Sequence, residues 1–295
     1  MADETAVEDG RSGPSRRGRI DEVRGYAEIG RPVNAAALAS FTLVGAYVGG
    51  GDDVVSTAAA AATAVTLLGV FGGYTINDYV DRDVDRINDP DRPIPRGAVP
   101  TFGALVATAV AFGLAGIVAG VALPPAAGVL VAIQIVALLA YTPWVKGSYG
   151  LGNLLISALV GSAALLGGIA VERVEPVVVM ALLAFQMLFG LEILKDIEDV
   201  AGDAAAGLWT LPVALGRRRA IHLVLVVLFL TVPLSLIPYL RGTFGPAYLG
   251  VIVLAHLLTG VTMWKTVTAP AATALAWIKA AMLVCMAAFV AGRTF

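Results

Sequence analysis

The sequence predicts an all-α fold: a polytopic membrane bundle of nine transmembrane helices. Of its 295 residues, 58% are hydrophobic and only 14% are charged, and the mean hydropathy is +0.83. Soluble domains carry about 25% charged residues, so one soluble core could not bury this many apolar side chains. Nine apolar runs, each long enough to cross a bilayer as a helix of roughly 20 residues, are separated by turn residues.

The nine runs are bounded by Gly, Pro and charged residues, which favour turns over continued helix. Residues 49–53, Pro124-Pro125 and Glu175-Pro176 are examples of these boundaries. The predicted spans cover residues 33–50, 54–79, 101–123, 125–144, 151–171, 175–194, 219–240, 246–264 and 271–292.

The segment before the first span is polar and lacks the apolar stretch of a secretory signal. Its first thirty residues contain five Arg and seven acids. We expect residues 1–28 to form a disordered cytoplasmic tail, with a short interfacial helix near residues 23–29. Residues 29–295 are expected to form one transmembrane domain.

The distribution of basic residues orients the bundle. With the N-terminus on the cytoplasmic side, sixteen Lys and Arg lie on that side and only three lie on the other. Because basic residues are enriched in cytoplasmic loops, this asymmetry predicts an internal N-terminus, an external C-terminus and an odd number of spans. We therefore expect a multi-pass protein of the cell membrane that contacts membrane lipids.

The composition also excludes several functions. A net charge of −2 argues against a protein that binds nucleic acid through bulk positive charge. The single cysteine, Cys285, excludes a disulfide framework and an iron–sulfur site. The two histidines, His222 and His256, are far apart in the sequence and do not indicate a histidine-rich metal site or a haem site. No segment indicates an obligate protein partner.

Two aspartate triads share one register at the cytoplasmic ends of the second and sixth predicted spans. Each has the spacing i, i+3, i+7, and a constant offset of 118 residues relates them. Because these positions lie on one helix face, each triad should project its carboxylates together. The shared register predicts two four-helix pseudo-repeats followed by a ninth helix. The triads are Asp78, Asp81 and Asp85, and Asp196, Asp199 and Asp203.

The two triads predict a metal site. Six converging carboxylates would repel one another and take up protons unless a cation compensated them. Oxygen-only ligands favour Mg²⁺ or Mn²⁺ over zinc, so we predict that all six aspartates are catalytic residues and metal ligands for two Mg²⁺ ions. A solvated run of charges would explain one cluster but not a matched pair, and acids within membrane segments are functional candidates.

Basic and amide side chains near the triads predict the substrate. Metal ions bind phosphate oxygens and bases neutralise the remaining charge, so the combination suits a magnesium-bridged diphosphate. An otherwise apolar bundle suggests that this diphosphate carries a long apolar tail, as a polyprenyl diphosphate does. For Arg82 and Arg86, ordinary positive-inside topology is an equally good explanation. The predicted diphosphate contacts are Asn77, Arg82, Arg86, Arg92, Lys146, Lys195, Arg31 and Asn34.

At these residues the chain resembles the UbiA superfamily of intramembrane prenyltransferases. Residues 77–85 are similar to its first aspartate motif and residues 195–203 to its second, and the resemblance covers roughly residues 28–295. Residues 141–153 and Thr210-Leu211-Pro212 are also similar to the superfamily. The resemblance implies nine transmembrane helices around a central cavity, dependence on Mg²⁺ and transfer of a prenyl group from its diphosphate.

Two further segments narrow the resemblance. Residues 31–34 and 86–97 are most similar to the members that transfer geranylgeranyl from geranylgeranyl diphosphate to the hydroxyl of geranylgeranylglyceryl phosphate in archaeal ether-lipid synthesis. Chlorophyll-type members tend to have Thr-Trp at residues 33–34, and many aromatic-acceptor members have Tyr where Leu191 stands. An aromatic or chlorin acceptor is the alternative.

A secondary transporter is the non-enzymatic alternative, because transporters can also combine two repeats with acids at helix ends. In this chain, both acidic clusters lie at the same predicted end, and the two repeats have the same orientation. Release of diphosphate from geranylgeranyl diphosphate in the presence of an acceptor would separate an enzyme from a transporter.

Overall fold

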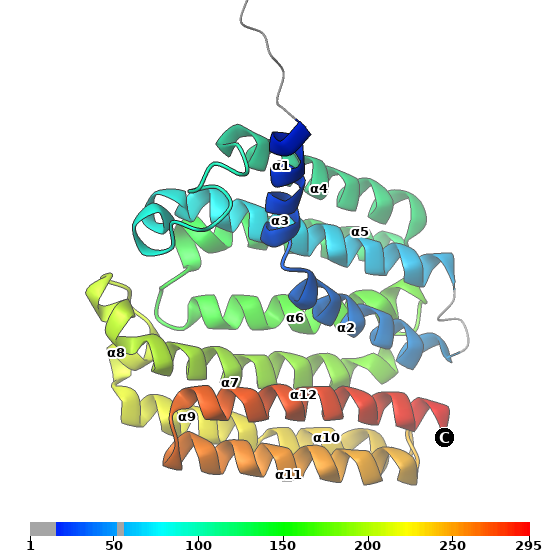
Figure 1. Ribbon diagram of the computed structural model, residues 1–295. Helices are drawn as coiled ribbons and strands as arrows, with labels where there is room; N and C mark the ends of the chain where they lie inside the picture. Colours follow the sequence, from blue (N-terminus) through cyan, green and yellow to red (C-terminus); the bar gives the residue numbers. More distant parts are fainter. Residues whose placement is uncertain (1–15, 52–55) are drawn as a thin grey trace, which may run out of the picture.

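The computed structural model describes residues 16–51 and 56–295 (Figure 1). Over these two ranges the regular structure is helical and includes no strand. Within the same ranges, nine helical segments are long and apolar enough to cross a bilayer. The predicted all-α bundle of nine spans is therefore confirmed.

The helices follow one another with short connections. Their bounds are α1 (Arg16–Ile29), α2 (Pro32–Gly50), α3 (Thr57–Asn88), α4 (Thr101–Ala122), α5 (Pro125–Ala140), the π-helical turn η2 (Tyr141–Val145), α6 (Leu151–Ala170), α7 (Glu175–Ala205), α8 (Leu211–Leu215), α9 (Arg217–Phe229), α10 (Thr231–Leu240), α11 (Pro246–Thr268) and α12 (Ala271–Thr294).

Helices α3 and α7 continue well past the ends predicted at residues 79 and 194. They contain 32 and 31 residues, or roughly 48 Å of helix at 1.5 Å per residue against a hydrocarbon core of about 30 Å. The prediction stopped where hydropathy falls, but polar residues propagate a helix that packing has already nucleated. Each aspartate triad consequently lies on one unbroken helix. We call the end of the bundle where α3 and α7 finish the acidic end; it lies at the left in Figure 1.

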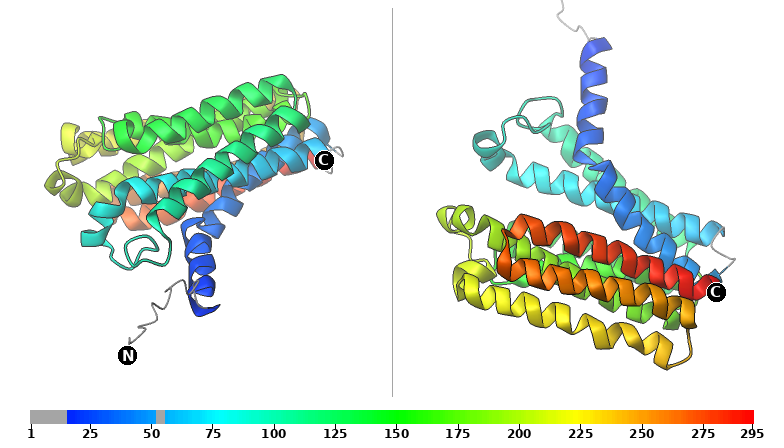
Figure 2. Two further views of the ribbon diagram at one scale, coloured as in Figure 1. Left: turned by 90° about the horizontal axis from the view of Figure 1, so that it is seen from above. Right: turned by 60° about the horizontal axis from the view of Figure 1, so that its bottom comes forward.

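The N-terminal segment is more ordered than its polarity suggested. Residues 16–28, predicted to be part of a disordered tail, belong to α1, which projects from the bundle (Figure 2). Ile29 is buried with Ile94 and Val99, and Glu28 accepts a hydrogen bond of 2.8 Å from Arg96. These contacts to the loop after α3 order the helix. The rest of the predicted tail, residues 1–15, lies outside the described residues.

Close contact between α2 and α6 joins the first helices of the bundle. A side chain at Gly45 would collide with the carbonyl oxygen of Ala164, and one at Gly167 would collide with that of Thr42. Small residues allow membrane helices to approach to backbone contact. These two glycines therefore fix the spacing of the helices that carry Arg31 and Asn153 to the acidic end.

We expect Gly167→Leu to destabilise the protein, because the new side chain would have to displace backbone atoms of α2. Overpacking of this kind costs about 1–3 kcal/mol. The measurement is the thermal midpoint in detergent micelles. Gly120→Leu is the matched control, since nothing lies within 4 Å of its added Cβ. Equal midpoints for the two variants would contradict the proposed packing constraint.

Candidate active site at the acidic end

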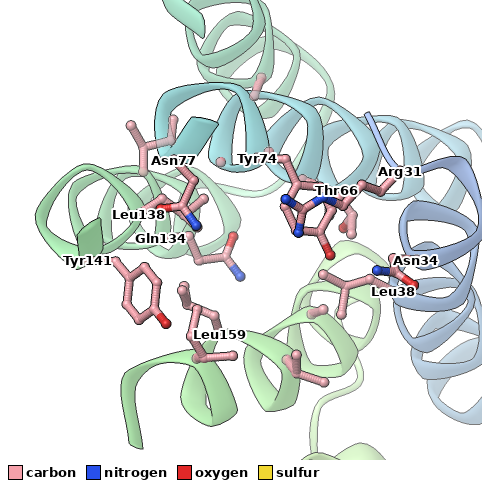
Figure 3. A pocket seen from close by; sticks show the side chains of 18 of the residues that line it. Arg31, Asn34, Leu38, Thr66, Tyr74, Asn77, Gln134, Leu138, Tyr141 and Leu159 are labelled. Carbon is pink, nitrogen blue, oxygen red and sulfur yellow. The ribbon is translucent and has the colours of Figure 1, made fainter. Parts of the chain in front are cut away.

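One cavity of about 320 Å³ reaches the acidic end, and α2, α3, α5 and α6 supply most of its lining (Figure 3). Asn77 enters it from the first aspartate motif, and Glu192 and Lys195 enter it from the start of the second. Tyr141 lies within electrostatic range of Asp81 as well as of residues in the second motif. The two motifs, far apart in sequence, therefore border one space.

Two acids of the first triad, Asp78 and Asp85, are neutralised by arginines from two different segments. Asp78 is buried, and its Oδ1 atom accepts a hydrogen bond of 3.1 Å from Nη2 of Arg31. The Nη1 atom of Arg92 lies 2.8 Å from Oδ2 of Asp85 and 3.5 Å from Oδ1 of Asp78. One nitrogen atom thus contacts two carboxylates of the triad, so both carboxylates are directed at a single cationic position.

Arg92 stays charged in this position. It lies outside the spans, in the loop after α3; burial lowers its pKa, but the carboxylates of Asp85 and Asp78 raise it by more, and the net shift is upward. Its Nε atom also contacts Asp89 at 3.2 Å. The loop that follows α3 therefore folds back so that the positive charge of Arg92 lies beside the carboxylates at the end of that helix.

Arg31 is positioned by an unusual backbone conformation. Its φ angle is +43°, in the left-handed region that L-residues seldom occupy, and Pro32 follows as the first residue of α2. This turn places the guanidinium 4.4 Å from the ring centroid of Tyr74 while it contacts Asp78. Figure 3 shows Arg31 over Tyr74 inside the cavity. Strain of this kind costs about 1–3 kcal/mol and is often found at functional sites.

The remaining acid of the first triad, Asp81, is paired with a lysine from a different segment of the chain. Asp81 accepts a hydrogen bond from Lys146, which follows the π-helical turn at Tyr141–Val145. The next carbonyl, of Gly147, accepts a backbone hydrogen bond of 2.8 Å from the N–H of Trp209. That bond ties the loop carrying Lys146 to the loop that follows the second triad.

Neutral donors, rather than arginines, contact the second triad. Asn153 Nδ2 donates to Asp196 at 2.7 Å, and Thr210 Oγ1 donates to Asp203 at 3.0 Å. Asp199 is exposed. Sequence reasoning placed Asn153 and Thr210 in family-like segments but did not assign them to the site. The sequence feature that marks each of them is a short polar side chain within a few residues of a glycine or proline turn. This feature is too common to identify a functional site by itself.

The remaining predicted contacts divide into two groups. Asn34, Asn77 and Lys195 line the cavity, and Lys195 contacts both carboxylate oxygens of Glu192 at 3.0 Å. The side chains of two arginines lie away from the triad. Arg82 lies over its neighbour Tyr79, and Arg86 pairs with the exposed Asp83 at 2.8 Å.

Leu191, expected to bear on acceptor choice, does not line the cavity. It is buried among apolar residues of α7, α9 and α12. Several polar cavity-lining residues were missed by sequence reasoning, and among them Gln134 donates a 2.8 Å hydrogen bond to Ser162. A single Gln in an apolar span gave no indication of which face it occupies.

The donor chemistry fits a hard divalent cation, although the carboxylates of the first triad are paired with bases in this arrangement. Among residues 16–51 and 56–295, no three Asp, Glu, His or Cys side chains are grouped closely enough to hold a metal ion. Asp78 and Asp85, however, already share one cationic nitrogen of Arg92. Carboxylate oxygens at such a point are suitable ligands for Mg²⁺.

Comparison with known proteins identifies the class. The chain belongs to the UbiA prenyltransferase family, whose model matches residues 38–291. It is therefore an intramembrane prenyltransferase.

Several proteins with high similarity are digeranylgeranylglyceryl phosphate synthases. The protein of that name from Natronomonas pharaonis is 44% identical over 277 residues, which cover 93% of this chain and 98% of that one. The Halobacterium salinarum protein of the same name is 43% identical over 271 residues, covering 92% and 97%.

Solved structures share the fold. A structure described as giving insights into the biosynthesis of digeranylgeranylglyceryl phosphate synthase in membranes has a TM-score of 0.82 and 27% identity, and covers 92% of this chain and 99% of that one. A UbiA homolog from Archaeoglobus fulgidus bound to DMAPP and Mg²⁺ has a TM-score of 0.69 and 20% identity, covering 91% and 99%.

We expect Arg92→Gln to lower the thermal midpoint measured in EDTA. The substitution leaves two partly or fully buried carboxylates short of a cation, and an unsatisfied buried group costs about 1–3 kcal/mol. Arg86→Gln is the control, because its exposed pair with Asp83 should contribute about 0–1 kcal/mol. A midpoint for Arg92→Gln that equals the control would contradict the compensating role of Arg92.

Proposed function

We propose that this prenyltransferase transfers the geranylgeranyl group of geranylgeranyl diphosphate to the free hydroxyl of geranylgeranylglyceryl phosphate, in a Mg²⁺-dependent reaction of archaeal ether-lipid synthesis. The observation that carries the proposal is one largely apolar cavity whose lining includes Asn77 of the first aspartate motif and Lys195 of the second. The names of the relatives that are 43–44% identical support the choice of acceptor.

The two triads would hold two Mg²⁺ ions, with Mn²⁺ as a substitute. Bound there, the metal would neutralise charge on the diphosphate leaving group. Arg92 and Lys146 now contact Asp85 and Asp81, and both side chains are flexible enough to turn from the carboxylates to phosphate oxygens. Asn153 and Thr210 would orient the second triad through the hydrogen bonds they donate.

The cavity would protect the reaction. Most of its lining is apolar, with residues such as Leu38, Ile135 and Leu138, so it excludes water that would otherwise capture an allylic cation-like centre. The acceptor hydroxyl forms a bond to C1 of the prenyl chain as the bond from C1 to the diphosphate oxygen breaks. The hydroxyl proton passes to the departing diphosphate, and Arg31 and Arg92 stabilise its charge.

The distribution of Lys and Arg indicates how the protein is oriented in the membrane. The loops and helix ends at the acidic end carry most of the Lys and Arg of the chain. Under the positive-inside rule this end faces the cytoplasm. We propose that the protein lies in the cell membrane with its substrate diphosphate bound at the cytoplasmic surface.

We expect Asp81→Ala and Asp199→Ala each to abolish Mg²⁺-dependent transfer, because each removes a carboxylate from one triad. The measurement is product formation from labelled geranylgeranyl diphosphate by purified protein. Asp83→Ala is the control on the same helix, since Asp83 is exposed and pairs with the neighbouring arginines Arg82 and Arg86. Full activity of either triad variant would refute the assignment of these carboxylates.

A panel of acceptors tests the substrate. We expect purified protein to use geranylgeranylglyceryl phosphate at least tenfold better, in kcat/KM, than an aromatic acid or a chlorin. A preference for the aromatic or chlorin acceptor would contradict the proposed acceptor and support the alternative one. If substrate crossed the membrane of a proteoliposome without diphosphate release, transport rather than catalysis would be indicated.

A further inference from the structure

The residues that line the cavity extend from the acidic end into the interior of the bundle. At the acidic end it begins with Arg31, Asn77 and Tyr141, and on α3 its lining continues through Gly69 to Val65. From Asn77 to Val65 is twelve residues of helix, or roughly 18 Å at 1.5 Å per residue. The cavity is therefore a narrow passage that runs from the charged mouth into the membrane-embedded part of the bundle.

The far end of this passage is closed by packed side chains. Val65, Ala115 and Val131 line the cavity, and each also belongs to a buried apolar cluster that continues away from the acidic end. They are at most 2% exposed. The remaining cluster members that seal this end are Ala62, Ala119, Leu123, Ala127, Leu166 and Ala170.

The side walls also form a ring. Helix α2 packs against α3 and α6, while α5 packs against the same two helices. Figure 3 shows these four helices around the space that Leu38, Thr66, Gln134 and Leu159 enter. In contrast, α9–α12 supply none of the lining residues. A chain that enters from the mouth is therefore held between α2, α3, α5 and α6.

Gly69 leaves an opening about two-thirds of the way along the passage from Asn77 to Val65. It lines the cavity, and an added Cβ would meet nothing within 4 Å. The missing side chain thus contributes cavity space and is not needed for helix packing. This distinguishes it from Gly72 on the same helix, whose added Cβ would collide with Phe112.

We infer that the blind passage selects the prenyl donor by the length of its chain. The open position at Gly69 admits the distal part of the prenyl chain, and the floor at Val65, Ala115 and Val131 sets the longest chain that is accepted. This inference rests on the proposed function. Donors shorter than the passage leave its end unfilled, whereas longer donors meet the packed floor. Discrimination then depends on apolar fit, for which one methylene group is worth roughly 10–200-fold.

The test compares geranyl, farnesyl, geranylgeranyl and geranylfarnesyl diphosphates with one acceptor. Wild-type protein should prefer the geranylgeranyl donor. We expect Gly69→Leu to change the ratio of kcat/KM for geranylgeranyl over geranyl diphosphate by at least about tenfold towards the shorter donor, because leucine blocks the passage above its floor. Val131→Ala should increase relative use of the longer geranylfarnesyl donor by deepening the floor.

Gly116→Leu is the matched control, because Gly116 is an exposed glycine of α4 with open space at its Cβ and no contact with the cavity. Its donor ratio should equal that of wild type. An unchanged ratio in Gly69→Leu, or an equal loss with every donor, would overturn the inference while leaving the proposed function intact.

Two other outcomes are decisive. If Gly69→Leu does not fold, the donor ratio of Val131→Ala decides: an unchanged ratio overturns the inference. If wild-type protein transfers no prenyl group to geranylgeranylglyceryl phosphate, the proposed function fails and this inference fails with it.

Discussion

Compensation of carboxylate charge at the edge of a low-dielectric bundle is the constraint on which the site depends. Acids placed there must be paired, hydrogen-bonded or bound to cations. In the first triad, Arg31, Arg92 and Lys146 meet this requirement, and each comes from a different segment. The same pairing draws the start of α2, the loop after α3 and the loop after η2 around the cavity mouth.

Much of this arrangement could be predicted from the sequence. Hydropathy located the nine spans, and the i, i+3, i+7 spacing placed each triad on one helix face because helical periodicity is local. The length of α3 was underestimated, since hydropathy reports burial in lipid and not where helical hydrogen bonding stops. Contacts such as Asn153 with Asp196 join elements 43 residues apart, and no local pattern specifies them.

The two pseudo-repeats have unequal roles. Both carry an aspartate triad at the same end, but the first repeat supplies α2, α3 and α5 to the cavity wall, whereas the second supplies α6 and, at the mouth, Glu192 and Lys195 of α7. Helices α7, α11 and α12 instead pack around large buried side chains such as Tyr248 and Phe289. Most of the cavity wall therefore comes from the first repeat, and α6 of the second repeat completes it.

The hydrogen bond between the Trp209 amide and the Gly147 carbonyl joins the mouth loops of the two repeats. Since both partners belong to the main chain, most amino acids at position 209 can still form it, and only proline there would remove the donor. Gly147 is more restricted, because its φ angle is +74° and an added Cβ would meet Leu208. The side chain at position 209 can therefore vary without separating the loop after η2 from the loop after α7.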